Sequence, residues 1–211
     1  MGSSELIGLG LFVLFAVVAA AVMWTTVQRR AQRKEAFIAR GWSYQEIPRG
    51  YEAGGGEVVP WTLRVATGRG QQKVWASQWT APAQPAGHAV LVGPKLDLPD
   101  AMLLMGGGLV GMLLRMVLGD RASELHGAAE VRTVGTPAFR ARFTVIATDA
   151  DAAEALLTDA VQEALLGSPE DVVVLRWNDE VQLRRQKGLW TPDDAVAFVA
   201  LGEAVAQGCG Y

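Results

Sequence analysis

The stretch LIGLGLFVLFAVVAAAVMWTTV, residues 6–27, continues for 22 residues without a charged side chain. As a helix it would be about 33 Å long at ~1.5 Å per residue, enough to cross a hydrocarbon core of roughly 30 Å. A tryptophan near its end and four basic residues just after it form the border that lipid headgroups favour. The stretch therefore predicts a transmembrane anchor, and the predicted membrane-interface residues are Trp24, Arg29, Arg30, Arg33 and Lys34.

The charges on either side of this stretch predict its orientation. The residues before it, Met-Gly-Ser-Ser-Glu, contain no Lys or Arg, and positive charge stays on the cytoplasmic side of a membrane. We therefore expect a single-pass protein with its N-terminus outside and its C-terminal domain in the cytoplasm. A cleavable signal peptide is the alternative, because residues 19–21 are alanines, but such peptides have a basic start and a shorter apolar region.

The remaining chain is long enough to bury a core of its own. We expect residues 1–28 to form the anchor, 29–41 a juxtamembrane basic helix that Gly41 ends, and 42–211 an α+β domain. Two halves of that domain, 42–97 and 129–211, are joined by the apolar segment 98–128. The predicted fold class is thus a single N-terminal transmembrane helix followed by a mixed α+β cytoplasmic domain with antiparallel hairpins.

Charge is unevenly distributed along the chain. Residues 29–95 contain 10 basic and 4 acidic side chains, whereas residues 96–211 contain 9 basic and 17 acidic ones. The half nearer the anchor would face anionic lipid favourably. A juxtamembrane basic cluster followed by ordinary acidic helices is the simpler interpretation, and so acidic a distal half argues against nucleic acid as a partner.

Apolar periodicity predicts the secondary structure of both halves. In the first half we expect strands at 42–47 and 88–92, a turn at 50–56, a β-hairpin formed by 61–66 and 73–80, and a proline-rich connection at 81–87. In the second half we expect a strand at 139–147, helices at about 150–166 and 192–207, and a hairpin turning at Asn178-Asp179. The predicted core residues on the sheet are Trp61, Leu63, Val65, Phe143, Val145, Val173 and Leu175.

A second apolar stretch, AMLLMGGGLVGMLLRMVL at residues 101–118, is interrupted only by Arg115. Its 14 uncharged residues before that arginine are more typical of a buried or interfacial segment than of a membrane span, although a second span remains open. Its glycines match G-x-G-x-x-G, but the acidic residue that a dinucleotide site requires is missing from the expected place. The candidate partner or lipid contacts are Met102, Met105, Leu109, Met112, Leu113 and Met116.

The sequence contains few residues of the types that carry catalysis or bind metals. Cys209 is the only cysteine, and the two histidines, His88 and His126, are too few for a histidine-rich metal centre. No P-loop, G-x-S-x-G or H-E-x-x-H motif occurs. We therefore expect no catalytic residues, no cofactor and no bound metal, and we expect that the protein is not an enzyme.

The order of FTVIATDADAAEALLT, the strands DVVVLRW and EVQLRR, and the final helix with FVALGEAV resembles uncharacterised bacterial membrane-anchored proteins of the DUF3137 kind. This resemblance implies an α+β cytoplasmic domain on a bacterial inner (cytoplasmic) membrane and offers no family active site to transfer. The expected function is a membrane-anchored interaction or accessory protein, with membrane lipid and another membrane or cytoplasmic protein as partners. The alternatives are a lipid-binding domain at the membrane surface and, less favoured, a membrane-surface enzyme.

Overall fold

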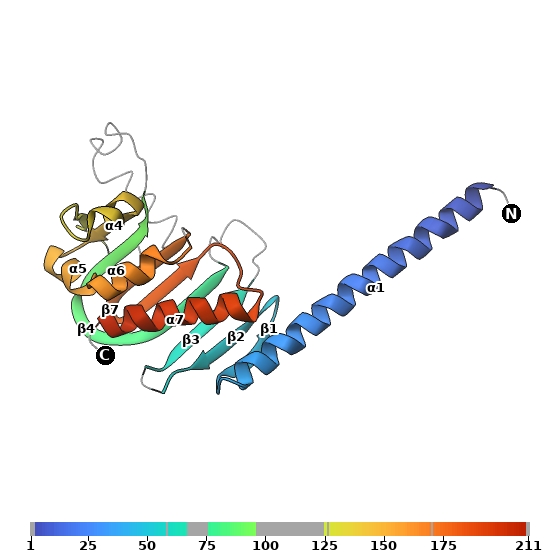
Figure 1. Ribbon diagram of the computed structural model, residues 1–211, viewed down its shortest axis with the longest axis horizontal. Coiled ribbons are helices and arrows are strands. Elements are labelled where there is room, and N and C mark those ends of the chain that lie inside the picture. The colour runs from blue at the N-terminus through green and yellow to red at the C-terminus, as the bar shows by residue number, and fades with distance from the viewer. Residues whose placement is uncertain are drawn as a thin grey trace.

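The computed structural model describes residues 3–57, 59–66, 76–95, 125, 127–169 and 171–209, and the side chains of its first helix from Phe15 onward. That helix, α1 (Ser3–Ile38), is continuous, so the predicted anchor and the juxtamembrane helix form one rod that projects from the domain (Figure 1). It ends before Gly41, whose φ of 75° suits a glycine after a helix. Within the residues whose side chains the structure describes, no helical segment is both long and apolar enough to cross a membrane.

An antiparallel sheet forms the body of the domain. Its strands are β1 (Ser43–Ile47), β2 (Gly50–Gly55), β3 (Trp61–Ala66), β4 (Ser77–Pro94), β5 (Ala129–Glu130), β6 (Phe143–Ala147) and β7 (Val172–Arg185). The strand order is β1-β2-β3-β4-β6-β5, and β7 also pairs with β4. Because the early residues of β4 pair with β3 and its last residues pair with β6, this 18-residue strand joins both halves of the chain in one sheet.

The helices of the second half lie on one face of this sheet (Figure 1): α4 (Pro137–Arg142), α5 (Ala150–Leu156), α6 (Asp159–Leu166) and α7 (Pro192–Gly208). The main core lies between them and the sheet. α7 approaches β4 so closely at Gly202 that a Cβ there would be 2.5 Å from the ring of Trp79. A smaller cluster, centred on Leu91, Leu175 and Trp177, is buried on the opposite face.

The α+β class and the predicted core are confirmed. All seven predicted core residues are buried, and β3 alternates between buried and exposed side chains over its six residues. The helix at the C-terminus also begins as predicted: Thr191 accepts a hydrogen bond from the backbone of Asp194, and Pro192 follows at the first helical position. Local capping chemistry and strand alternation are therefore reliable guides in this chain.

Two predicted interruptions lie inside long strands. The proline-rich residues 81–87 belong to β4, and Asn178-Asp179 belongs to β7 and forms no hairpin turn. The two strands pair along most of their length, with register shifts between Pro82 and Ala86 and between Ala86 and Val90. These irregularities allow the strand to accept residues that would otherwise end it, because a bulge removes the need for a regular ladder hydrogen bond.

Three other boundaries differ from prediction. Residues 137–142 are helical, not extended, because Thr136 caps the first turn and Pro137 starts it. The single helix expected at 150–166 is two helices, since Thr158 caps a new one by accepting from the backbone of Val161. The turn expected at 50–56 is strand β2, which pairs with strands on both sides. In each case a cap or a strand partner decided the local structure.

Candidate functional site

The last turns of α1 pack against the edge of the sheet, where aromatic side chains and a buried arginine meet. Phe37 is 0% exposed. Its ring centroid lies 5.3 Å from that of Trp42, 5.9 Å from that of Tyr44 and 5.7 Å from that of Tyr51. Aromatic pairs at these separations add to the stabilisation that burial alone provides. Phe37 therefore fixes the end of α1 on strands β1 and β2.

Arg33 lies one turn earlier on the same face of α1 and is only 5% exposed. Its guanidinium carbon lies 4.5 Å from the ring centroid of Tyr51 and 5.7 Å from that of Trp190. No carboxylate lies within 4.0 Å of it among the described residues, and its Nε has no hydrogen-bond partner there. The two aromatic faces, together with a side-chain hydrogen bond to Tyr44, therefore stabilise this buried cation locally.

Tyr51 links this junction to the loop before α7. Its hydroxyl donates a hydrogen bond to the carbonyl oxygen of Leu189 at 2.6 Å. Burial raises the pKa of Tyr51, and the nearby positive charge of Arg33 opposes that effect only in part. Burial likewise raises the pKa of Tyr44, again opposed by Arg33. Both phenols are therefore protonated near neutral pH, and Tyr51 faces the guanidinium as a neutral ring.

The predicted membrane-interface residues do not all face the same surroundings. Arg29, Arg30 and Lys34 are exposed on α1, and Arg30 lies 3.7 Å from a carboxylate oxygen of Glu46. Arg33 instead points into the domain, as described above. Its different role could be suspected from its position four residues before Phe37, since residues at that spacing share a helix face, but the sequence does not show which face meets the sheet.

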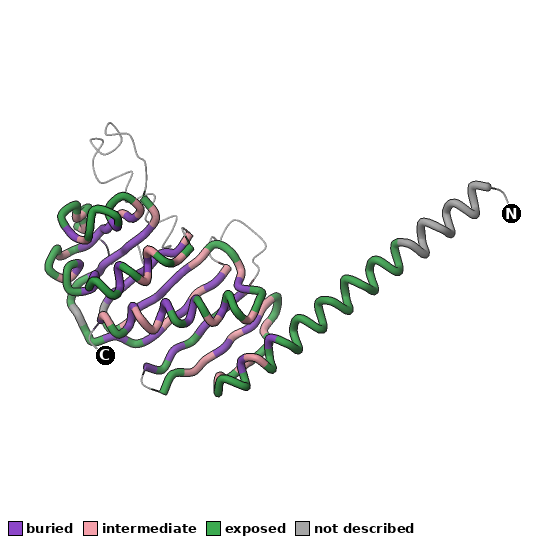
Figure 2. The backbone as a smooth tube through the Cα atoms, viewed as in Figure 1, coloured by how far each residue is buried: buried purple, intermediate pink, exposed green. Residues whose placement is uncertain are grey.

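The residues of α1 from Phe15 to Val27, before this junction, are exposed (Figure 2). Phe15 is 76% exposed, and the other exposed large apolar residues of this part are Val17, Val18, Val22, Met23, Trp24 and Val27. An uninterrupted apolar surface of this kind is unusual on a monomeric protein in water. The helix therefore presents a surface that requires an apolar partner.

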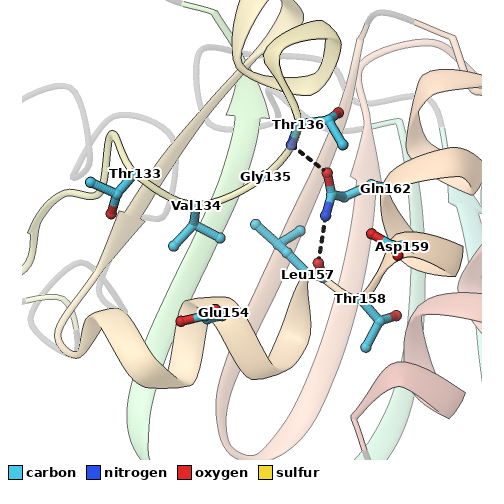
Figure 3. Close-up of a pocket in the computed structure, with 9 residues that line it drawn as sticks. All are labelled: Thr133, Val134, Gly135, Thr136, Glu154, Leu157, Thr158, Asp159 and Gln162. Atoms are coloured by element: carbon cyan, nitrogen blue, oxygen red, sulfur yellow. Dashed lines mark hydrogen bonds between the residues drawn. The ribbon is translucent and has the colours of Figure 1, made fainter.

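A shallow pocket of about 600 Å³ lies between the loop 133–136 and the helices α5 and α6 (Figure 3). Gln162 crosses its floor: its carbonyl oxygen accepts from the backbone N–H of Thr136, and its amide donates to the carbonyl of Leu157, both at 2.7 Å. Glu154 and Asp159 line the pocket from different helices and do not converge (Figure 3). Gln162 therefore connects the loop 133–136 to the end of α5 through these two hydrogen bonds. The side chains that line the pocket form no catalytic arrangement.

Other reactive side chains are dispersed over the described structure. His88 and Asp149 approach to 3.5 Å, but Asp149 also caps α5, and both side chains are well exposed. Cys209 is buried, and burial raises its pKa to about 11 against a partial opposing effect of Arg176. Within the ranges that the structure describes, no three His, Cys, Asp or Glu side chains are grouped as metal ligands would be.

The predicted contacts of the second apolar stretch lie outside the described residues, as do His126 and the G-x-G-x-x-G match. These candidates are Met102, Met105, Leu109, Met112, Leu113 and Met116. Their role therefore stays a prediction. The structure adds residues that the sequence did not single out, namely Phe37, Tyr51 and Trp190 at the base of α1.

Comparison with known proteins gives a fold relationship. No protein-family model matches the chain, and no characterised protein matches it by sequence. One solved structure is similar: the crystal structure of the mycobacterial trehalose monomycolate transport factor A, TtfA. The likeness covers 84% of this chain and 94% of that one, with a TM-score of 0.50 and 9% sequence identity. At that identity the likeness concerns the fold alone.

Proposed function

We propose that the protein is a membrane-anchored accessory protein, in which α1 crosses the membrane and holds the α+β domain at its surface for docking onto a protein partner. The observation that carries this proposal is the exposed apolar surface of α1 from Phe15 to Val27, which no described part of the domain covers. The proposed span, residues 6–27, also includes the apolar residues that precede Phe15. Together they have the length and border of a membrane-crossing helix.

The junction at the base of α1 supports an accessory role. Because Phe37 and Arg33 are buried against the sheet, the domain is attached to the helix without a flexible linker. A domain held in this way presents constant surfaces to neighbouring membrane proteins. The similar structure is described as a transport factor, which gives one precedent for this fold in a transport process. The role we propose is non-catalytic.

A lipid-binding domain is the alternative. It would use the apolar stretch 101–118 together with the basic residues near the anchor. The stretch 101–118 is either an exposed contact surface or part of the core, and replacing Leu109 and Leu113 by Ser distinguishes these two cases. An unchanged thermal transition would mark an exposed contact surface, whereas loss of the transition would place these side chains in the core, where hydroxyls and cavities are costly. Lipid that co-purifies with the intact protein would favour the lipid-binding alternative.

Topology mapping tests the proposed anchor. A reporter fused after residue 211 should be active when it requires the cytoplasm and inactive when it requires the periplasm. The protein should also remain with membranes after alkaline extraction. Replacing Val18 and Val22 by Arg should release it, because charged residues at the centre of a span are costly, whereas replacing both by Leu should not. Release of the unaltered protein by alkali would contradict the proposal.

A further inference from the structure

Trp190 is the only exposed large apolar side chain outside α1 among the described residues, with 39% of its surface accessible. It lies in the segment that connects β7 to α7. The remaining large apolar side chains of the described domain are buried or partly buried against its core. An isolated exposed tryptophan is not unusual by itself, so its location decides what it can contact.

Trp190 lies beside the base of α1, within the reach of Arg33, whose guanidinium carbon is 5.7 Å from its ring. Arg33 follows Val27, the last residue of the proposed span, by six positions, which is about 9 Å of helix. Side chains on a helix lean toward its N-terminus, and here that direction is toward the membrane. The headgroup layer is roughly 5–8 Å thick on each side of the hydrocarbon core. Trp190 therefore lies near the level of that layer.

Two hydrogen bonds hold the segment just before Trp190. The hydroxyl of Ser77 donates to the carbonyl of Lys187 at 2.8 Å, and Leu189 accepts from Tyr51. The indole lies over Gly188 so closely that a Cβ there would be 2.4 Å from the indole nitrogen. The ring is therefore placed by its surroundings, and a glycine is required beneath it.

The charges near Trp190 are mixed. Lys187 is exposed in the same segment, Arg30 and Lys34 are exposed near the end of α1, and Asp193 and Asp194 are exposed at the start of α7. The amphipathic indole itself favours the boundary between hydrocarbon and water, whatever the headgroup charge.

We propose that Trp190 is a second contact with the bilayer, through which the domain touches the headgroup layer of the membrane that α1 crosses. This inference rests on the proposed function, because it requires α1 to be in the membrane. Figure 1 shows the arrangement that it needs: the N-terminal end of α7 lies beside α1, whereas its C-terminal end lies on the far side of the domain. The two contacts together would set the tilt of the domain against the membrane.

Photocrosslinking of the full chain in phosphatidylcholine vesicles tests this proposal. A benzophenone amino acid, which resembles an aromatic side chain, replaces one residue at a time: Val18 within the proposed span, Trp190, or Gln207. Gln207 is exposed near the distal end of α7 and is the matched control. We expect lipid adducts at Val18 and at Trp190, with a yield at Trp190 at least five-fold above that at Gln207.

The outcomes separate the inference from the proposed function. If Val18 forms no lipid adduct, the proposed anchor fails and the inference fails with it. If Val18 forms adducts but Trp190 forms no more than Gln207 does, the anchor stands and the contact at Trp190 is wrong. Circular dichroism of each labelled protein shows whether it is folded, so a low yield from an unfolded variant is recognised and the measurement is repeated with the benzophenone at Lys187, the exposed neighbour in the same segment.

Discussion

The two ends of the described part of α1 differ in what surrounds them, although they belong to one helix. From Phe15 to Val27 the large apolar side chains are exposed, whereas Phe37 near the other end is completely buried and Arg33 nearly so. The first part requires an apolar environment from outside the protein, and the second finds one within it. Helix formation is therefore common to both parts, but the partner that stabilises each part is different.

The largest effect should come from removing the buried aromatic ring at the junction. Replacing Phe37 by Ala should lower the free energy of unfolding by about 3–5 kcal/mol, because the cavity lies among three aromatic neighbours. Denaturant unfolding of the full chain in detergent measures this. The adjacent Ile38 is 55% exposed, and its replacement by Ala should cost less than about 1 kcal/mol. Equal losses at both positions would mean that α1 does not pack on the sheet through Phe37.

A smaller effect is expected at the buried cation. Replacing Arg33 by Ala should lower the free energy of unfolding by about 2 kcal/mol, the value for a desolvated cation–π contact. The matched control is Arg29→Ala, because Arg29 lies on the exposed part of the same helix and should change stability by less than about 0.5 kcal/mol. If Arg33→Ala leaves the free energy of unfolding unchanged, the aromatic contacts of Arg33 do not hold the junction.

The smallest effect concerns the phenol of Tyr51. Replacing Tyr51 by Phe should cost about 1 kcal/mol at neutral pH, because the hydrogen bond to Leu189 is lost. The pKa of Tyr51 is raised in the folded protein from an ordinary value of 10.0. Its protonated form is therefore favoured by folding, so its contribution is fully present below pH 10 and is lost as the pH rises further.

The free energy of unfolding, measured from pH 8 to pH 11, tests whether stability falls as the pH rises. The unaltered protein should lose stability above pH 10 more steeply than the Tyr51→Phe variant does. Because Cys209 and Tyr44 titrate in both proteins, the difference between the two curves isolates Tyr51. Parallel curves would indicate that the phenol is not buried in the way described.

The sequence predicted those features of the fold that depend on local patterns. Alternating residues in β3 and the cap at Thr191 gave the correct elements, because burial of one face and capping act over a few residues. Pro82 and Asn178 were misleading. Both are usual turn residues, yet each lies in a strand that continues because β4 and β7 pair with each other on either side of the irregularity. Such long-range pairing leaves no mark in a short window of sequence.

The candidate site was predicted less completely. The basic cluster after residue 27 was visible, but the four-residue spacing from Arg33 to Phe37 did not show which face of α1 meets the sheet. The burial of Arg33 depends on that face and on Tyr51, which is distant in sequence. Trp190 was not singled out for the same reason, since its place beside α1 follows from the pairing of β7 and the packing of α7.

The central claim is that a membrane-embedded helix and the domain form one rigid unit. The most direct test is the distance between spin labels at Val22 and Gln207 in the full chain with Cys209→Ser, reconstituted in vesicles and measured by double electron–electron resonance. The account predicts one narrow distance distribution, with the label at Val22 accessible to oxygen but not to an aqueous nickel complex, and a broadened distribution after Phe37→Ala. A broad distribution in the otherwise unaltered chain, or a label at Val22 that water-soluble nickel reaches freely, would contradict it.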